Sequence, residues 1–279
     1  MNFRFLLLML GSFILVLALF VILTGGGFGT NSRTGPLEIN KITFIAHRGL
    51  YNYYAENSLE GYERCEEMGF DAIETDIRVT KDRHLIVFHD DSTSRLLKKH
   101  SLIEQLNYAD LDNYNLHFHG TPTQNKVLSL DLFLQNFKQK FTIYLDNKVN
   151  KKWVADSLVM KLKIVGAENS VIIASSNLLF LAYIKYKNKN LYTVLEGFDA
   201  GKEWIFHFIP KYYKPDYYSS FMSKVNEEQI NFLRKNNILD RKIVYGVDSS
   251  NVNAVLKAGI QHMIIDFDSS LTSLLHEHL

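Results

Sequence analysis

Apolar residues follow two different spacings along the chain after residue 40. Eight short segments are rich in β-branched and aromatic residues and are bounded by polar residues, a pattern that predicts strands. They are residues 41–47, 71–79, 141–147, 170–176, 191–197, 216–221, 242–248 and 261–266. In six further segments the apolar residues recur every three or four positions, which predicts helices. These are residues 58–69, 130–140, 153–166, 177–187, 226–237 and 251–259.

The alternation of strands and helices predicts the fold class. Eight strands with helices between several of them, over roughly 230 residues, favour a parallel (β/α)8 barrel of the TIM type. A doubly wound open sheet is the alternative, but no glycine-rich phosphate loop follows the first strand, which argues against a nucleotide-binding sheet. A barrel carries its chemistry at the carboxyl ends of the strands, where His47, Arg48 and Asp146 stand.

Residues 74–91 interrupt this alternation. Two strand-like runs are joined by "TKDR", which is too short for a helix, so the segment is predicted to form a hairpin. Folding back at this turn brings His89 beside Glu74 and Asp76. Two acids and a histidine are therefore expected to meet through local structure alone.

The first 24 residues differ from the rest of the chain. Residues 5–23 contain no charged side chain, and as a helix they would be about 28 Å long, close to the thickness of the hydrocarbon core of a bilayer. We predict a single-pass transmembrane anchor at 1–24, a linker at 25–40 and a catalytic domain at 41–279. The short N-terminus before the span favours an extracytoplasmic catalytic domain. A cleaved signal peptide is the alternative, because the glycines at 25–27 offer a cleavage site.

Composition removes some classes of function and leaves others open. The chain of 279 residues has a formal net charge of +1, so no nucleic-acid partner is indicated. Cys65 is the only cysteine, which excludes an intramolecular disulfide and suits either a reducing compartment or an exported protein.

Acidic residues at two strand ends indicate a metal site. Glu74 and Asp76 are two positions apart on a strand, so both face the same way. Two adjacent carboxylates repel each other unless a cation lies between them or one of them holds a proton. Asp146, at the end of another strand, offers a third ligand. Ligands that are all oxygen atoms suit Mg²⁺ or Ca²⁺, whereas surface charge at strand ends is the alternative reading.

Two histidines beside this cluster indicate proton transfer. His47 and His89 have side chains that titrate near neutral pH, so one can remove a proton while the other donates one. Arg48 and Lys148 add positive charge that suits a phosphate ester. A covalent mechanism is disfavoured, because there is no nucleophilic Ser-x-Gly elbow and Cys65 falls inside a helical pattern.

Four short motifs carry a resemblance to a known family. "AHRG", "ENS", "IETDIRVTKD" and "VFHD" resemble the opening signature of glycerophosphodiester phosphodiesterases, which belong to the phosphatidylinositol phospholipase C-like barrels. "LDNK", "ASSN", "VYGVD" and "IIDFD" extend the similarity over nearly everything after residue 42. The resemblance implies metal-dependent hydrolysis of a glycerophosphodiester, small or lipid-derived, to glycerol phosphate and an alcohol.

The resemblance also implies roles for individual residues. His47 and His89 would be the acid–base pair, with His47 as the base by analogy with the wider superfamily. Arg48, Lys148 and Tyr245 would bind the substrate. Tyr245 departs from the family, which usually has tryptophan there, so the identity of the alcohol is open.

The same resemblance implies that Glu74, Asp76 and Asp146 hold Mg²⁺ or Ca²⁺ and that Glu56 shapes the site. Asp146 stands where the family usually has glutamate, one methylene longer, which bears on the choice of metal. Two rival functions are a lysophospholipase D-like or phosphoinositide-cleaving activity on a membrane lipid, and a catalytically inactive barrel that binds a phosphorylated ligand.

Overall fold

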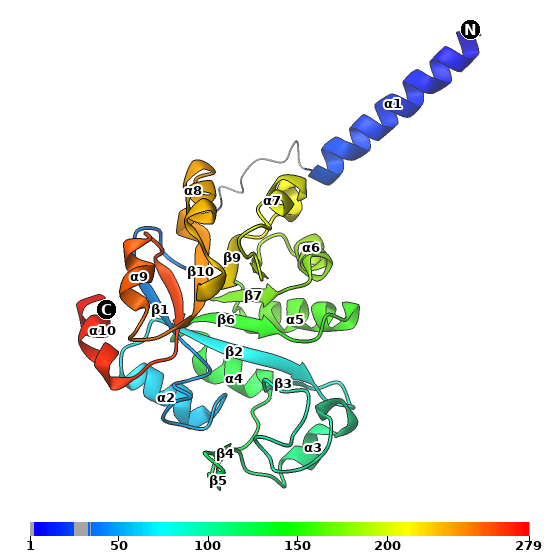
Figure 1. The fold of residues 1–279 in the computed structure, drawn as a ribbon. Helices are drawn as coiled ribbons and strands as arrows, with labels where there is room; N and C mark the ends of the chain where they lie inside the picture. The colour runs from blue at the N-terminus through cyan, green and yellow to red at the C-terminus, as the bar shows by residue number, and fades with distance from the viewer. Residues whose placement is uncertain (1–2, 25–32, 34, 279) are drawn as a thin grey trace.

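The computed structural model describes residues 3–24, 33 and 35–278. Eight parallel strands form a closed barrel, and pairing of β1 with both β11 and β2 closes it (Figure 1). The strands are β1 (Thr43–Ala46), β2 (Ala72–Val79), β6 (Thr142–Asn147), β7 (Val171–Ser175), β8 (Tyr192–Glu196), β9 (Tyr217–Phe221), β10 (Lys242–Val247) and β11 (His262–Ile265). The predicted (β/α)8 barrel is confirmed, and each strand lies within its predicted segment.

Helices cover the outside of the barrel, where the outward-facing strand residues pack against them. All six predicted helices are present: α2 (Leu59–Glu67), α4 (Leu130–Phe137), α5 (Lys152–Val165), α6 (Leu178–Lys187), α8 (Glu227–Lys235) and α9 (Val252–Lys257). Outside residues 92–126, two short helices, α7 (Trp204–Phe208) and α10 (Thr272–His278), were not predicted. Segments of five and seven residues are too short to show a helical repeat of apolar positions.

The inside of the barrel changes from apolar to polar along its axis. Ile45, Tyr144 and Val194 belong to an apolar cluster inside the strands, and Leu37 packs against the same cluster. Because successive residues of a strand face opposite sides, the inward positions continue two residues further along each strand. Asp146 and Glu196 occupy those next inward positions, so the carboxyl end of the barrel is lined with charge.

A hairpin and a long excursion follow β2. β3 (Leu85–Val87) pairs antiparallel with β2, as predicted for residues 74–91. Residues 92–126 then form a lobe with its own apolar cluster beside the barrel (Figure 1). The lobe contains η1 (Ile103–Gln105), α3 (Tyr108–Leu111), β4 (His117–Phe118) and β5 (Thr121–Pro122). Four further 3-10 turns are η2 (Lys211–Tyr213), η3 (Met222–Lys224), η4 (Leu239–Arg241) and η5 (Ser269–Leu271).

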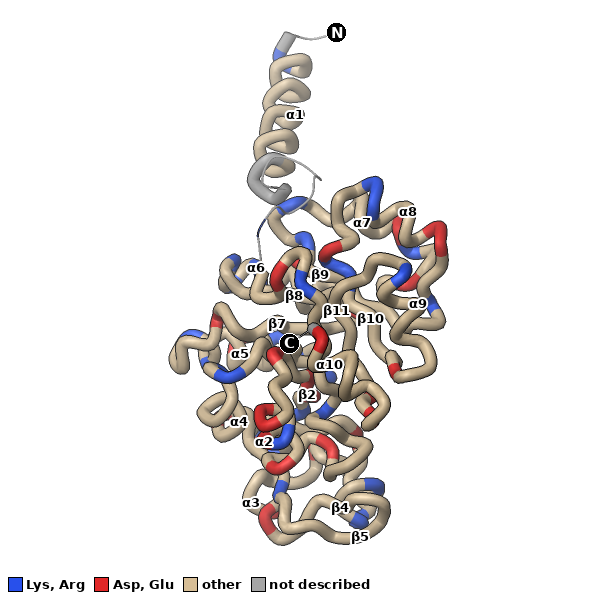
Figure 2. The backbone as a smooth tube through the Cα atoms, turned by 90° about the vertical axis from the view of Figure 1, so that its left-hand side faces the viewer, with Lys and Arg blue, Asp and Glu red and all other residues tan. Residues whose placement is uncertain are grey.

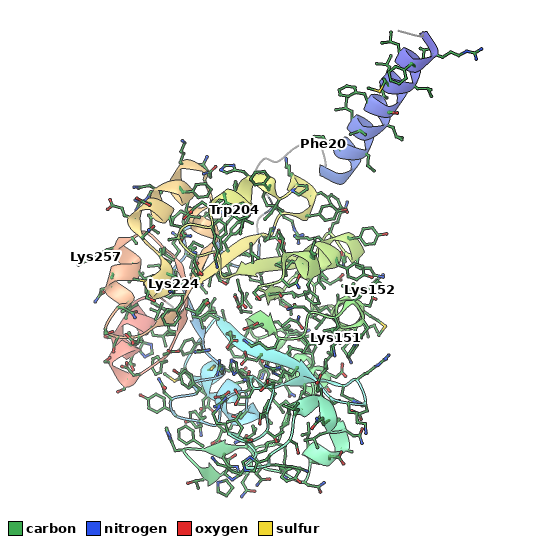
Figure 3. All side chains as sticks on the ribbon, turned by 45° about the vertical axis from the view of Figure 1, so that its right-hand side comes forward. Phe20, Lys151, Lys152, Trp204, Lys224 and Lys257 are labelled. Atoms are coloured by element: carbon green, nitrogen blue, oxygen red, sulfur yellow. The ribbon has the colours of Figure 1, made fainter. Side chains whose placement is uncertain are left out.

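α1 (Phe3–Thr24) projects away from the barrel, and in Figure 2 its described tube carries charge only at its start. Its side chains spread outward in Figure 3, and Phe5 is 54% exposed. Within the described residues, no helix is long and apolar enough to cross a membrane. The predicted transmembrane anchor at 1–24, and with it the single-pass membrane location, is therefore not supported.

The predicted linker at 25–40 falls mostly outside the described residues. Its last part, residues 35–40, is described and runs along the barrel, where the backbone N–H of Leu37 donates a hydrogen bond to the Tyr217 hydroxyl at 3.3 Å. The domain boundary at residue 41 remains a prediction.

Candidate active site

A cavity of about 320 Å³ opens at the carboxyl ends of the barrel strands. Every charged residue that was predicted to hold the metal, bind phosphate or carry the proton lines it, whereas Glu56, which was predicted to shape the site, does not. The lining residues are His47, Arg48, Glu74, Asp76, His89, Tyr144, Asp146, Lys148, Glu196, Phe221, Tyr245 and Ile264.

Three buried carboxylates meet at the floor of this cavity. β2 and β6 pair so that Asp76 lies opposite Asp146, and Glu74 stands two residues earlier on β2. One carboxylate oxygen from each of the three acids lies within 4.8 Å of the other two. All three side chains are buried. The distances between their oxygens show that the three acids converge, as the sequence predicted.

The electrostatics of these acids indicate a shortage of positive charge. Burial raises the pKa of Glu74 well above its usual value. Burial, together with the nearby Glu196 carboxylate, raises the pKa of Asp146 to about 8. For Asp76 burial acts in the same direction, but Arg48 and Lys148 outweigh it and hold its pKa below the usual value. Among the described residues, Asp76 Oδ1 accepts no hydrogen bond, although Lys148 Nζ lies 3.1 Å away. These acids can all ionise together only if further positive charge enters the site.

His47 is held in one orientation by an acid. It follows β1, and its Nδ1 lies 2.6 Å from Asp266 Oδ1, so Nδ1 carries the proton that the carboxylate accepts. The ring of Tyr51 packs edge-on at a centroid distance of 5.0 Å. His47 Nε2 is left 3.9 Å from Glu74 Oε2, on the cavity side. Asp266 lies in the "IIDFD" motif and was given no role from the sequence, and the structure shows that it contacts His47.

His89 has the same arrangement. Its Nδ1 lies 2.7 Å from Asp90 Oδ1, and Arg95 Nε donates to Asp90 Oδ2 at 2.8 Å. Burial opposes ionisation of Asp90, but the hydrogen bonds from Arg95 and His89 lower its pKa to about 2. Asp90 is therefore ionised at neutral pH and fixes the proton on His89 Nδ1. As predicted, the hairpin brings His89 next to β2: the N–H of Phe88 donates to the carbonyl of Asp76 at 3.0 Å.

The turn after β1 explains the "HRG" motif. Arg48, Gly49 and Leu50 all have positive φ, at 50°, 69° and 55°. This left-handed turn directs the backbone N–H of Arg48 to Glu74 Oε2 at 3.0 Å. A Cβ at Gly49 would lie 2.9 Å from the Tyr62 ring, so glycine is required by both conformation and space.

Glu56 does not line the cavity, but it forms ion pairs with Arg48 and Arg95. Arg95 binds both of its oxygens, at 2.5 and 2.8 Å, and Arg48 Nη1 donates to Oε1 at 3.3 Å. Arg48 Nε also lies 3.1 Å from Asp76 Oδ2. Among the described residues, Glu56 therefore contacts the three floor acids only through Arg48, and its site-shaping role stays a prediction.

Asn57 contacts one of the floor acids, although the sequence did not predict it in the site. Its Nδ2 donates to Asp76 Oδ2 at 2.9 Å, and its Oδ1 accepts from the Tyr62 hydroxyl at 2.8 Å. The next residue, Ser58, caps α2 by accepting a hydrogen bond from the N–H of Gly61.

The opposite side of the cavity is formed by Glu196, Phe221 and Tyr245. The Tyr144 hydroxyl donates to Glu196 Oε1 at 2.7 Å, and burial raises the pKa of Glu196. The rings of Phe221 and Tyr245 meet edge-on at a centroid distance of 5.5 Å. Tyr245 was predicted here, whereas Glu196 and Phe221 were not.

Comparison with known proteins gives these features a family. The model of the Glycerophosphoryl diester phosphodiesterase family matches residues 47–268, which include every predicted site residue. The chain belongs to this family. The glycerophosphodiester phosphodiesterase of Caldanaerobacter subterraneus is 26% identical over 251 residues, covering 85% of this chain and 99% of that relative.

Solved structures from the family share the fold. A glycerophosphodiester phosphodiesterase from Thermotoga maritima has a TM-score of 0.67 at 20% identity and covers 86% of this chain and 99% of its own. A phosphodiesterase from Oleispira antarctica, in complex with the product sn-glycerol-3-phosphate, has a TM-score of 0.71 at 15% identity, with coverage of 84% and 96%. Among glycerophosphoryl diester phosphodiesterases, this chain is therefore similar in architecture and divergent in sequence.

Proposed function

We propose that the chain is a metal-dependent phosphodiesterase that hydrolyses glycerophosphodiesters to glycerol 3-phosphate and an alcohol, and that residues 41–279 form its catalytic domain. One observation carries the proposal: two histidines, each with its Nδ1 on an acid, line the same cavity as three converging carboxylates. The family's description and the product bound in the Oleispira antarctica relative support the substrate class.

The three acids fit a divalent cation. Glu74, Asp76 and Asp146 offer oxygen atoms only. Burial and the neighbouring carboxylates raise the pKa values of Glu74 and Asp146, and a cation would offset both effects by stabilising the ionised acids. Oxygen ligands of this kind suit Mg²⁺ or Ca²⁺. When bound, the ion supplies positive charge that polarises a phosphoryl oxygen.

Arg48 and Lys148 are proposed to orient the phosphodiester. Lys148 Nζ is bonded to Asp146 and lies 3.1 Å from Asp76 Oδ1, and Arg48 Nε lies 3.1 Å from Asp76 Oδ2. The Arg48 and Lys148 side chains are thus held next to the floor acids by ion pairs. Both also line the cavity, where they can bind phosphoryl oxygens.

His47 and His89 are proposed to move the protons. Asp266 and Asp90 hold the proton on each Nδ1, so each Nε2 is the atom available for transfer. We assign His47 as the base that receives the proton of the attacking oxygen and His89 as the acid that protonates the leaving alcohol. The reverse assignment uses the same contacts, and the attacking oxygen belongs either to water or to a substrate hydroxyl.

The proposal is tested by release of glycerol 3-phosphate from glycerophosphocholine by the purified full-length protein. We expect activity with Mg²⁺ or Ca²⁺, loss in excess chelator, and recovery when the ion is restored. His100→Ala serves as a control histidine variant, because His100 is exposed and lies in the excursion lobe. Full activity in excess chelator would contradict the metal assignment. Lysophosphatidylcholine and a phosphoinositide in the same assay test whether lipid is cleaved instead.

A further inference from the structure

Three adjacent strands form one wall of the cavity. Glu196 lies on β8, Phe221 at the end of β9 and Tyr245 on β10, and the strands are neighbours in that order. We call these three residues the β8–β10 wall. The metal-site acids and both histidines come instead from β1, β2, β6 and the β3 hairpin. At Glu196 the wall adjoins the floor of the cavity, because burial and the charge of Glu196 raise the pKa of Asp146. Phe221 and Tyr245 continue the wall on two strands that carry none of the three floor acids, so we expect the wall to meet the alcohol of a substrate.

A hydrogen bond holds the Glu196 carboxylate, and further contacts anchor the loop that follows it. The Tyr144 hydroxyl donates to its Oε1 at 2.7 Å and lies 3.0 Å from the Ser219 hydroxyl. The loop that follows is anchored through the carbonyl of Phe198, which accepts from Lys242 Nζ at 3.0 Å and from Gln229 Nε2 at 2.9 Å. The Glu196 carboxylate is thus positioned before any substrate arrives.

The two aromatic rings form a corner beside it. Their planes are 75° apart, and Phe221 remains 44% exposed, so ring surface is available at the mouth. Gly246 permits this packing, because a Cβ there would lie 2.4 Å from the Phe221 ring. The position of Phe221 therefore depends on a glycine in the next strand.

The charge of the cavity distinguishes between substrates. The described lining residues include four acids and two permanent cations, Arg48 and Lys148, so their net charge is two negative charges when all four acids are ionised. A divalent ion on the three floor acids would bring this net charge to zero, and without Glu196 the net charge would be one positive charge. A phosphodiester carries one negative charge. The extra carboxylate is therefore matched by a substrate with one additional positive charge.

We propose that the β8–β10 wall selects glycerophosphodiesters whose alcohol carries an ammonium group, as choline does. A carboxylate next to aromatic faces is a favourable environment for a quaternary ammonium ion. The inference rests on the proposed function and adds the class of alcohol to it. Glu196 is the residue that determines specificity, and the two rings supply the cation–π surface.

Two substrates isolate the charge. One is glycerophosphocholine, and the other is the diester of 3,3-dimethylbutanol, which keeps the shape of choline but replaces its nitrogen by carbon. We expect the wild-type protein to prefer the choline diester by about 10-fold in kcat/KM, and Glu196→Gln to reduce the preference to about 2-fold or less. An unchanged preference in Glu196→Gln, or no preference in the wild type, would overturn the inference.

Binding tests the same inference without turnover. In the His89→Ala protein, calorimetry with Ca²⁺ present should show tighter binding of the choline diester, and Glu196→Gln added to this background should abolish the difference. Equal binding of both diesters by His89→Ala overturns the inference. Selective binding by a protein whose wild type hydrolyses neither diester leaves the inference standing and contradicts the proposed function.

A metal titration separates recognition from an effect on the ion. The affinity for Mg²⁺, measured by calorimetry without substrate, should fall by less than 10-fold in Glu196→Gln, because Glu196 lies outside the group of three converging acids and acts on Asp146 through its charge. A loss of 10-fold or more would place Glu196 among the metal-holding groups and overturn its assignment to the substrate.

Discussion

The two halves of the barrel mouth are built differently. The half formed by β1, β2 and β6 gathers buried acids, each close to a cation or a histidine. The half formed by β8, β9 and β10 presents a single carboxylate and two aromatic rings, one of them largely exposed. The first half suits a phosphoryl group and a metal, and the second suits an alcohol.

The difference lies in how much each half depends on the rest of the chain. In the first half, short motifs carry several contacts each: Arg48 reaches Glu74 through its backbone and Glu56 through its side chain. In the second half, each strand supplies one residue, so the wall exists only once the barrel closes. Changes in the first half should alter the rate for every substrate, whereas changes in the second should alter the choice among substrates.

The largest effect is expected for His89→Ala. Removing the proposed acid should lower kcat by about 10²- to 10⁴-fold for both the choline diester and the 3,3-dimethylbutanol diester, and the ratio of the two rates should stay unchanged. The measurement is glycerol 3-phosphate release, with His100→Ala as the matched histidine control. Near-normal turnover of His89→Ala would show that another group protonates the alcohol.

Glu74→Gln should have the next largest effect. It keeps the shape of the side chain but removes one charge from the group of three acids, so we expect activity to fall by about 10²-fold or more and metal affinity to fall with it. Calorimetric titration with Mg²⁺ and Ca²⁺ measures the affinity directly. Glu67→Gln, an exposed glutamate on α2, is the control. An unchanged affinity in Glu74→Gln would remove it from the metal site.

The metal should stabilise the protein more at high pH. The pKa of Asp146 rises from 3.8 to about 8 on folding, so the folded metal-free protein holds a proton that the unfolded chain releases. The contribution of Asp146 to the free energy of unfolding of the metal-free protein therefore falls as the pH rises from 3.8 to about 8. A cation that replaces the proton should raise Tm more at pH 8 than at pH 5.5. Asp146→Asn should reduce the difference between the metal-induced increases in Tm at the two pH values. An equal increase at pH 8 and pH 5.5 in the wild type would contradict the prediction.

The smallest effect is expected in the second half. Gly246→Ala places a Cβ against the Phe221 ring, so we expect the preference for the choline diester to fall by about 2- to 5-fold. Gly120→Ala is the matched control: Gly120 also has positive φ, at 83°, but a Cβ there meets nothing within 4 Å. Both variants carry similar backbone strain, so a loss of preference in both would assign the effect to strain and not to Phe221.

The same division explains what the sequence could predict. Strand and helix patterns predicted the barrel, because local spacing encodes both. Glu74, Asp76 and His89 were predicted to meet because one hairpin joins them. The contact of Asp266 with His47 depends on pairing between the last strand and the first, which local spacing does not encode. Glu196 and Phe221 had no motif to mark them; their inward alternation at strand ends was the one available signal.

The most direct test of this account is ³¹P NMR of glycerophosphocholine incubated with the full-length protein and Mg²⁺ or Ca²⁺. We predict that the diester resonance declines while the monoester resonance of glycerol 3-phosphate grows, and that excess chelator stops both changes. A persistent diester resonance, or phosphocholine as the monoester formed, would contradict the account.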